Sequence, residues 1–208
     1  MGRLDSAERV PVDSRAELRA WFAGNHTRPD GVWLVTWRPA SGRPAPSYDD
    51  VVCECLAVGW VDSIVRALDD DRTMLYLAPR RPRSGWSRPN KERVARLEAE
   101  GLMTEAGRRV VDAARTDGSW SLLDEVEDLV VPADLAAAFD ARPGAREHWD
   151  AFPRSVRRGV LEWIVQAKRP ETRARRVSET ADRAAVGERA NQWRPGSGAA
   201  SAERAPAG

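Results

Sequence analysis

Segments with the composition of β-strands are confined to residues 32–78, whereas the chain beyond them carries only helical patterns. Residues 32–37, 60–68 and 73–78 are rich in β-branched and aromatic residues, and turn-forming residues bound them. The acidic turn at 69–72 predicts that the last two strands pair as a hairpin. Because strands and helices are segregated instead of alternating, we predict an α+β fold and not a doubly wound parallel sheet. The sheet is expected to be small and largely antiparallel, with about three strands packed with helices.

Hydroxyl side chains mark the positions where helices are expected to begin. Ser14, Ser47, Ser87 and Thr104 each precede a helical pattern, and a hydroxyl there can accept a hydrogen bond from a free N–H group of the first turn. Pro132 then opens an all-helical C-terminal region in which further prolines separate the helices. The helices expected there span about residues 133–141, 144–151, 154–168 and 171–186.

These patterns divide the chain into four parts. We expect a flexible leader at residues 1–13, an α+β domain at 14–130, a helical region at 131–186 and a tail at 187–208. The tail is rich in Gly, Ala, Ser, Pro and charge, a composition that does not build a core and predicts disorder.

Compartment and metal chemistry follow from what the sequence lacks. No apolar run approaches the roughly 18–20 residues that span a bilayer, and the N-terminus lacks the layout of a signal peptide. The two cysteines, Cys53 and Cys55, point to different sides of a helix, which favours packing over a disulfide or a metal site. His26 and His148 add too few ligands for zinc. We expect a cytoplasmic protein without a metal or cofactor.

Residues 59–91 are the stretch most indicative of a binding site. Its last strand leads into a basic loop at 80–83 and then to a helix N-terminus, where free N–H groups and the helix dipole attract anions. Arginine forks bind oxyanions, and indole rings supply a flat apolar wall beside them. The candidate ligand-binding residues are Trp60, Asp62, Arg80, Arg81, Trp86, Ser87, Asn90 and Lys91.

Each of these residues has an expected role. The two arginines and the lysine hold an anionic group, and Ser87 and Asn90 add hydrogen bonds to it. The tryptophans wall the pocket. Asp62 lies two residues from Trp60 on one strand face and orients a neighbouring cation.

Other interpretations compete with this one. In a purely structural interpretation, Arg80 and Arg81 pair with acidic residues at 117–134 or at 69–71, and the tryptophans are core. Arginine interleaved with tryptophan also resembles a surface for single-stranded nucleic acid, but a net charge of +1 argues against it. An enzyme acting on a phosphorylated or carboxylated metabolite would use Asp62 as acid or base. The phosphate-loop, dinucleotide, nucleophile-elbow and zinc-protease motifs are absent from the sequence, so we favour binding and assign no catalytic residue.

A second basic stretch occupies residues 167–176 around Pro170. Arg173 and Arg176 are three apart and can lie on one helix face. The simplest interpretation is a solvated or salt-bridging face. The alternative is a face that closes over the Arg80 site or binds an acidic partner.

Several phrases, in order, resemble the YdeI/OmpD-associated, bacteriocin-protection family across residues 14–186. They are Asn25-His26 before Gly-Val-Trp-Leu-Val, Gly-Trp-Val-Asp-Ser at 59–63, Arg80-Arg81-Pro with Trp86-Ser87 and Asn90-Lys91, Gly-Leu-Met-Thr-Glu-Ala-Gly at 101–107, and Ala-Lys-Arg-Pro-Glu-Thr-Arg-Ala-Arg-Arg at 167–176. Pro89 departs from the family's pattern. The resemblance implies a role in tolerance of bacteriocins, cationic antimicrobial peptides and other envelope stress, and an OmpD-associated type of C-terminal region. It implies no catalytic activity or cofactor.

Overall fold

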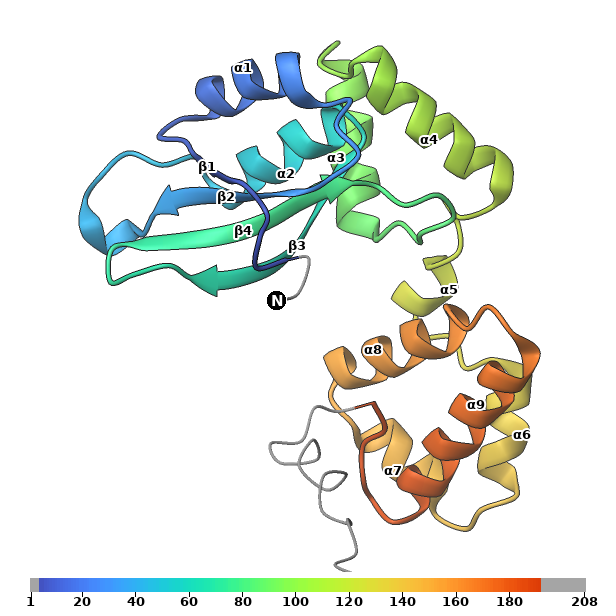
Figure 1. Ribbon diagram of the computed structural model, residues 1–208. Coiled ribbons are helices and arrows are strands. Elements are labelled where there is room, and N and C mark those ends of the chain that lie inside the picture. The colour runs from blue at the N-terminus through green and yellow to red at the C-terminus, as the bar shows by residue number, and fades with distance from the viewer. Residues whose placement is uncertain (1–3, 192–208) are drawn as a thin grey trace, which may run out of the picture. The chain divides into compact units, whose positions relative to one another are not determined.

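The computed structural model describes residues 4–191, and the chain divides into two compact units, Met1–Asp124 and Glu125–Gly208 (Figure 1). The division falls after Asp124, earlier than the boundary expected after residue 130. Residues 192–208, which hold most of the expected disordered tail, lie outside the described residues.

The first unit contains a four-stranded mixed sheet in the order β1-β2-β4-β3. The strands are β1 (Arg9–Pro11), β2 (Val32–Trp37), β3 (Trp60–Ala67) and β4 (Arg72–Pro79). β4 pairs antiparallel with both β2 and β3, and the acidic turn joins β3 to β4 as a hairpin. With helices beside this sheet and only helices after it, the predicted α+β class is confirmed.

The segment expected to be a flexible leader contains β1, a strand that the sequence did not predict. β1 pairs parallel with β2, in the register Arg9 opposite Trp33, and Val10 and Val12 are buried. The Trp33 indole N–H donates to the Leu4 carbonyl at 2.7 Å. A three-residue strand shows no recognisable period in a sequence, because its stability comes from pairing with a distant strand.

In the first unit, α1 (Arg15–Asn25) and α2 (Tyr48–Ala57) lie along one side of the sheet, and α3 (Arg88–Ala99) and α4 (Glu105–Asp117) pack on α2 (Figure 1). A short 3-10 helix, η1, spans Pro39–Ser41. Three of the four expected hydroxyl caps form, because Ser14, Ser47 and Thr104 each accept a backbone N–H of the first turn. Ser87 precedes α3 without a side-chain cap bond.

Helix α2 lies between two apolar clusters. On one side Cys55 packs with Phe22 of α1 and Leu77 of β4. On the other side Leu56 packs with Leu97 of α3 and with residues of α4. This packing holds both α1 and α4 close to the turn that joins α2 to β3.

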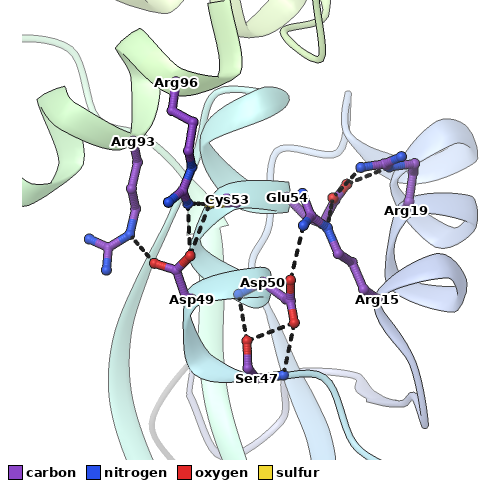
Figure 2. Close-up of polar contacts among 9 residues, drawn as sticks. All are labelled: Arg15, Arg19, Ser47, Asp49, Asp50, Cys53, Glu54, Arg93 and Arg96. Atoms are coloured by element: carbon purple, nitrogen blue, oxygen red, sulfur yellow. Dashed lines mark hydrogen bonds and ion pairs between the residues drawn. The ribbon is translucent and has the colours of Figure 1, made fainter. Parts of the chain in front are cut away.

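Ion pairs tie the neighbouring helices to α2 (Figure 2). Glu54 is 4% exposed and accepts hydrogen bonds from Arg15 and Arg19 of α1. Asp49 accepts from Arg93 and Arg96 of α3, each at 2.7 Å. Burial alone would raise the pKa of Glu54, but the hydrogen bonds from the two arginines lower it below its ordinary value.

The second unit is helical. Its helices are α6 (Ala133–Asp140), α7 (Ala145–Ala151), α8 (Arg154–Val165) and α9 (Pro170–Ala185), and α5 (Asp124–Glu127) stands at the boundary of the two units. Leu135, Phe139, Trp149 and Ile164 are buried, and the rings of Phe139 and Trp149 lie 5.4 Å apart. These helices match the predicted ones, and prolines begin or precede three of them.

Part of the basic stretch at 167–176 serves this helical packing. Arg173 of α9 forms an ion pair with Asp134 of α6 at 2.7 Å. The Arg176 guanidinium lies over the Trp163 ring at 4.9 Å and donates to the Trp163 carbonyl. The Arg173 ion pair matches the salt-bridging interpretation, whereas Arg176 packs on a tryptophan and bonds a backbone carbonyl.

Candidate functional site

A cavity of about 370 Å³ lies within the first unit, where four segments meet. The end of α1 contributes His26, the turn from α2 to β3 contributes residues 58–60, the loop from β4 to α3 contributes Arg80 and Trp86, and α4 closes the remaining side. These four segments are far apart in the chain, so only the folded unit can form this cavity.

Close backbone packing fixes α4 against the cavity. Gly59 has a φ of 81°, and a Cβ there would lie 2.7 Å from Val110 Cγ2. A Cβ on Gly107 would lie 2.3 Å from the Ala57 carbonyl oxygen, which also accepts hydrogen bonds from Thr104. A larger residue at either glycine would push α4 away, so the wall formed by α4 depends on both.

The two predicted tryptophans form apolar walls of this cavity. Trp60 packs edge-on against Phe22 at 5.3 Å, and its indole N–H donates to the His26 carbonyl at 2.8 Å. Trp86 packs against Trp120, with 5.0 Å between ring centroids. Both side chains are about 1% exposed, so neighbouring groups hold the rings in place.

Arg80 is the least satisfied charged side chain of the cavity. Its guanidinium carbon lies 3.7 Å from the centre of the Trp86 ring, and Nη2 donates to the Gly85 carbonyl. Nε and Nη1 are buried, and neither has a hydrogen-bond partner among residues 4–191. Burial lowers the pKa of Arg80 to about 10, although the charge of Asp62 acts in the opposite direction. The cavity therefore contains a desolvated cation with unused donors.

The loop that carries Arg80 has a strained backbone. Arg83 has a φ of 59°, in the left-handed region that favours glycine. Gly85 sits against Leu123, and a Cβ there would lie 2.8 Å from Leu123 Cγ. Ser84 caps the turn through a hydrogen bond to the Arg81 carbonyl at 2.7 Å. Backbone strain of this kind persists where the surroundings impose it, and it often accompanies binding sites.

Residues outside the predicted set also contribute to the cavity. Arg109 of α4 lines it and is paired with Glu105 at 2.7 Å. The side chain and the backbone N–H of Ser119 lower the pKa of Asp117, and the charge of Arg83 lowers it further. Ser119 Oγ is itself buried and makes no hydrogen bond of good geometry within the described residues. Residues of α4 gave no sequence signal, because their pattern is that of an ordinary amphipathic helix.

Asp62 and Arg81 lie outside this cavity. The Asp62 carboxylate accepts a hydrogen bond from the Tyr48 hydroxyl at 2.7 Å, so its hydrogen-bond partner is a tyrosine and not the expected cation. Tyr48 is 60% exposed, and its partial burial together with the hydrogen bond to Asp62 raises its pKa to about 12. Arg81 lines a separate hollow that also includes Tyr76.

The three residues around the start of α3 have other contacts. Ser87 stands at the N-cap, and the side-chain Oδ1 of Asn90 accepts a hydrogen bond from Arg93 at 3.1 Å. Lys91 forms an ion pair with Asp124 and lies 5.8 Å from the centre of the Trp120 ring. Of the eight predicted residues, the structure therefore brings Trp60, Arg80 and Trp86 to one cavity. That any of the eight binds a ligand stays a prediction.

Neither a metal-ligand cluster nor a membrane-spanning helix occurs among residues 4–191. No group of three or more His, Cys, Asp or Glu side chains in these residues is arranged to hold a metal ion. None of the helices described is long and apolar enough to cross a membrane.

Two family models match the chain, one for each unit. Residues 10–110 match a domain of unknown function, DUF8412. Residues 128–187 match the family described as "Bacteriocin-protection, YdeI or OmpD-Associated". No curated protein and no solved structure matches the chain. The cavity lies almost entirely within the segment of unknown function, and the recognised family covers the helical unit.

Proposed function

This chain carries a domain of the bacteriocin-protection (YdeI or OmpD-associated) family at residues 128–187, and on that premise we propose that it protects cells by binding a small anionic ligand. The ligand enters the cavity around Arg80, and the protein catalyses no reaction on it. The protective role covers bacteriocins and related stress, in keeping with the family's description. The cytoplasm is the proposed location, because Cys53 and Cys55 are free and buried, as suits a reducing compartment.

One observation carries the proposal more than any other. Arg80 lies over Trp86, and two of its guanidinium nitrogens are buried and lack an acceptor within the described residues. A buried donor without a partner costs roughly 1–3 kcal/mol, and more when the group is charged. A Met side chain has a similar length and would avoid this cost. An anion that accepts hydrogen bonds from these Arg80 nitrogens would remove this cost.

The two alternatives receive less support. The enzyme alternative requires Asp62 beside the ligand, whereas its carboxylate is paired with Tyr48 outside the cavity. The nucleic-acid alternative requires accessible arginines next to exposed rings, whereas Arg80 and Trp86 are stacked within the protein.

A survival assay tests the proposal. The full chain is expressed in a bacteriocin-sensitive bacterium, alongside Arg80→Met and the matched control Arg81→Met, which changes the neighbouring exposed arginine. We expect the wild type and Arg81→Met to raise survival at least tenfold, and Arg80→Met to lose most of that gain. Equal protection by Arg80→Met would exclude the cavity from the function, and no protection by the wild type would exclude the function itself.

A further inference from the structure

We infer that the ligand of the Arg80 cavity is a small organic monocarboxylate with a flat apolar body, and not a phosphorylated compound. This inference rests on the proposed function, because it names the ligand class of the same site. It follows from the size of the cavity, the nature of its walls and the balance of its charges.

The size of the cavity limits the ligand to one small molecule. A volume of about 370 Å³ lies near the lower end of the roughly 300–1,000 Å³ that is usual for small-molecule sites. A ring system with a short acidic side chain fits this space. A nucleoside triphosphate or a run of stacked bases would need more.

The walls favour an apolar ligand body. Trp60 and Trp86 line the cavity with rings that are about 1% exposed, and Val58, Val110 and Ala113 add aliphatic surface to its lining. Aromatic rings pack well against the edges of indole rings. A sugar or a polyamine would leave its polar groups against these walls without partners.

The charges of the cavity leave one cation uncompensated. Arg109 is paired with Glu105, and Arg83 has the Asp117 carboxylate as its electrostatic neighbour. Arg80 has no carboxylate within hydrogen-bond distance in the described part of the chain. One carboxylate neutralises one guanidinium, whereas a phosphomonoester carries about −1.5 to −2 charges and would repel Asp117 with the excess.

The count of free donors agrees with a carboxylate. Nε and Nη1 of Arg80 lack partners among the described residues, and Arg80 lines the cavity. A carboxylate offers two oxygens that accept from several donors. Because the Arg80 nitrogens are shielded from water, the guanidinium must turn toward the cavity to meet the carboxylate, and the resulting bond forms in a dry environment.

Calorimetry with three matched probes tests the inference on the full chain. The probes are indole-3-acetate, its uncharged amide indole-3-acetamide, and indoxyl phosphate, which share one ring system. We expect indole-3-acetate to bind at least tenfold more tightly than either of the others. Arg80→Met should abolish the difference between the acid and the amide, while Arg81→Met should leave it unchanged.

A second variant checks the location. Ala113 is exposed and lines the cavity, so Ala113→Trp should fill the opening, weaken all three probes more than tenfold and leave the thermal midpoint close to that of the wild type. Unchanged binding of indole-3-acetate to Ala113→Trp would overturn the assignment to this cavity.

The other outcomes separate the inference from the proposed function. Tighter binding of indoxyl phosphate that depends on Arg80 would overturn the carboxylate inference and leave an anion-binding function in place. Equal affinity for acid and amide, or binding of none of the probes, would overturn both.

Discussion

The Glu54 cluster, which consists of Glu54, Arg15 and Arg19, and the Arg80 cavity both hold buried charged atoms in the first unit. They differ in whether those atoms have hydrogen-bond partners. Glu54 accepts hydrogen bonds from two arginines, so its burial is fully compensated (Figure 2). Arg80 uses one nitrogen and leaves two without an acceptor among the residues described. A satisfied buried charge holds elements together, whereas an unsatisfied one weakens the fold unless something binds it. The difference separates structural charges from a candidate binding charge.

The largest effect is expected from breaking the satisfied cluster. Glu54→Ala leaves Arg15 and Arg19 without their main partner, although both remain partly in water. We expect a loss of about 2 kcal/mol in the free energy of unfolding, less than the roughly 3–5 kcal/mol of a fully buried pair. Urea denaturation followed by tryptophan fluorescence measures it. The control Asp112→Ala, which removes an exposed acid, should lower the free energy of unfolding by under about 0.5 kcal/mol. Similar losses in both variants would show that Glu54 stabilises the fold no more than an exposed acid does.

The same cluster should make stability depend on pH. Its arginines lower the pKa of Glu54 in the folded state, below the unfolded value of about 4.3. The stabilisation is therefore complete above pH 4.3 and is lost as pH falls through the lower, folded pKa. The free energy of unfolding of the wild type should exceed that of Glu54→Gln by about 1 kcal/mol at pH 6, and this difference should shrink toward pH 3. A difference in stability that grows as the pH falls would show that folding raises the pKa of Glu54 instead of lowering it.

Replacing the unsatisfied charge should have the opposite effect on stability. Arg80→Met keeps the length of the side chain and removes buried donors that lack partners. We expect the free energy of unfolding to stay equal to that of the wild type or to rise by up to about 1 kcal/mol. Thermal denaturation without ligand measures it. A clear loss of stability would place Arg80 with Glu54 as a structural charge.

The smallest effect concerns Asp62, whose charge acts on both Tyr48 and Arg80. Burial and the bond to Asp62 raise the pKa of Tyr48 to about 12. Asp62→Asn removes the negative charge, so ultraviolet titration should show one tyrosine ionising at lower pH, with little change in stability. Tyr48→Phe identifies which of the two tyrosines moves. An unchanged titration would show that burial alone raises this pKa.

Several features of the fold follow from the sequence with little help from tertiary structure. The hydroxyls of Ser14, Ser47 and Thr104 cap helices where expected, because a cap needs only the backbone of the next turn. The two strands around the acidic turn pair as predicted, since a hairpin joins neighbours in the chain. The strand at Arg9–Pro11 could not be predicted, because it depends on β2.

The site was predictable in part for the same reason. The stretch at 59–91 contributes Trp60, Arg80 and Trp86 to one cavity, and ligand binding there stays a prediction. Its residues do not all gather, because Lys91 lies on a helix whose rotation directs the ammonium to Asp124. Arg109 and Ser119 enter the cavity from the region of α4, which only packing on Gly59 and Gly107 brings there.

The sequence by itself determined the order and ends of most helices and strands, the separation of a mixed unit from a helical one, and the match of residues 128–187 to a family model. It could do so because caps, turns and periodic burial act over a few residues. Only the tertiary structure decided which charges are satisfied. Glu54 finds partners on α1 and Arg80 finds none beyond Gly85 in the described chain, and such pairings depend on distances between segments that the local sequence does not encode.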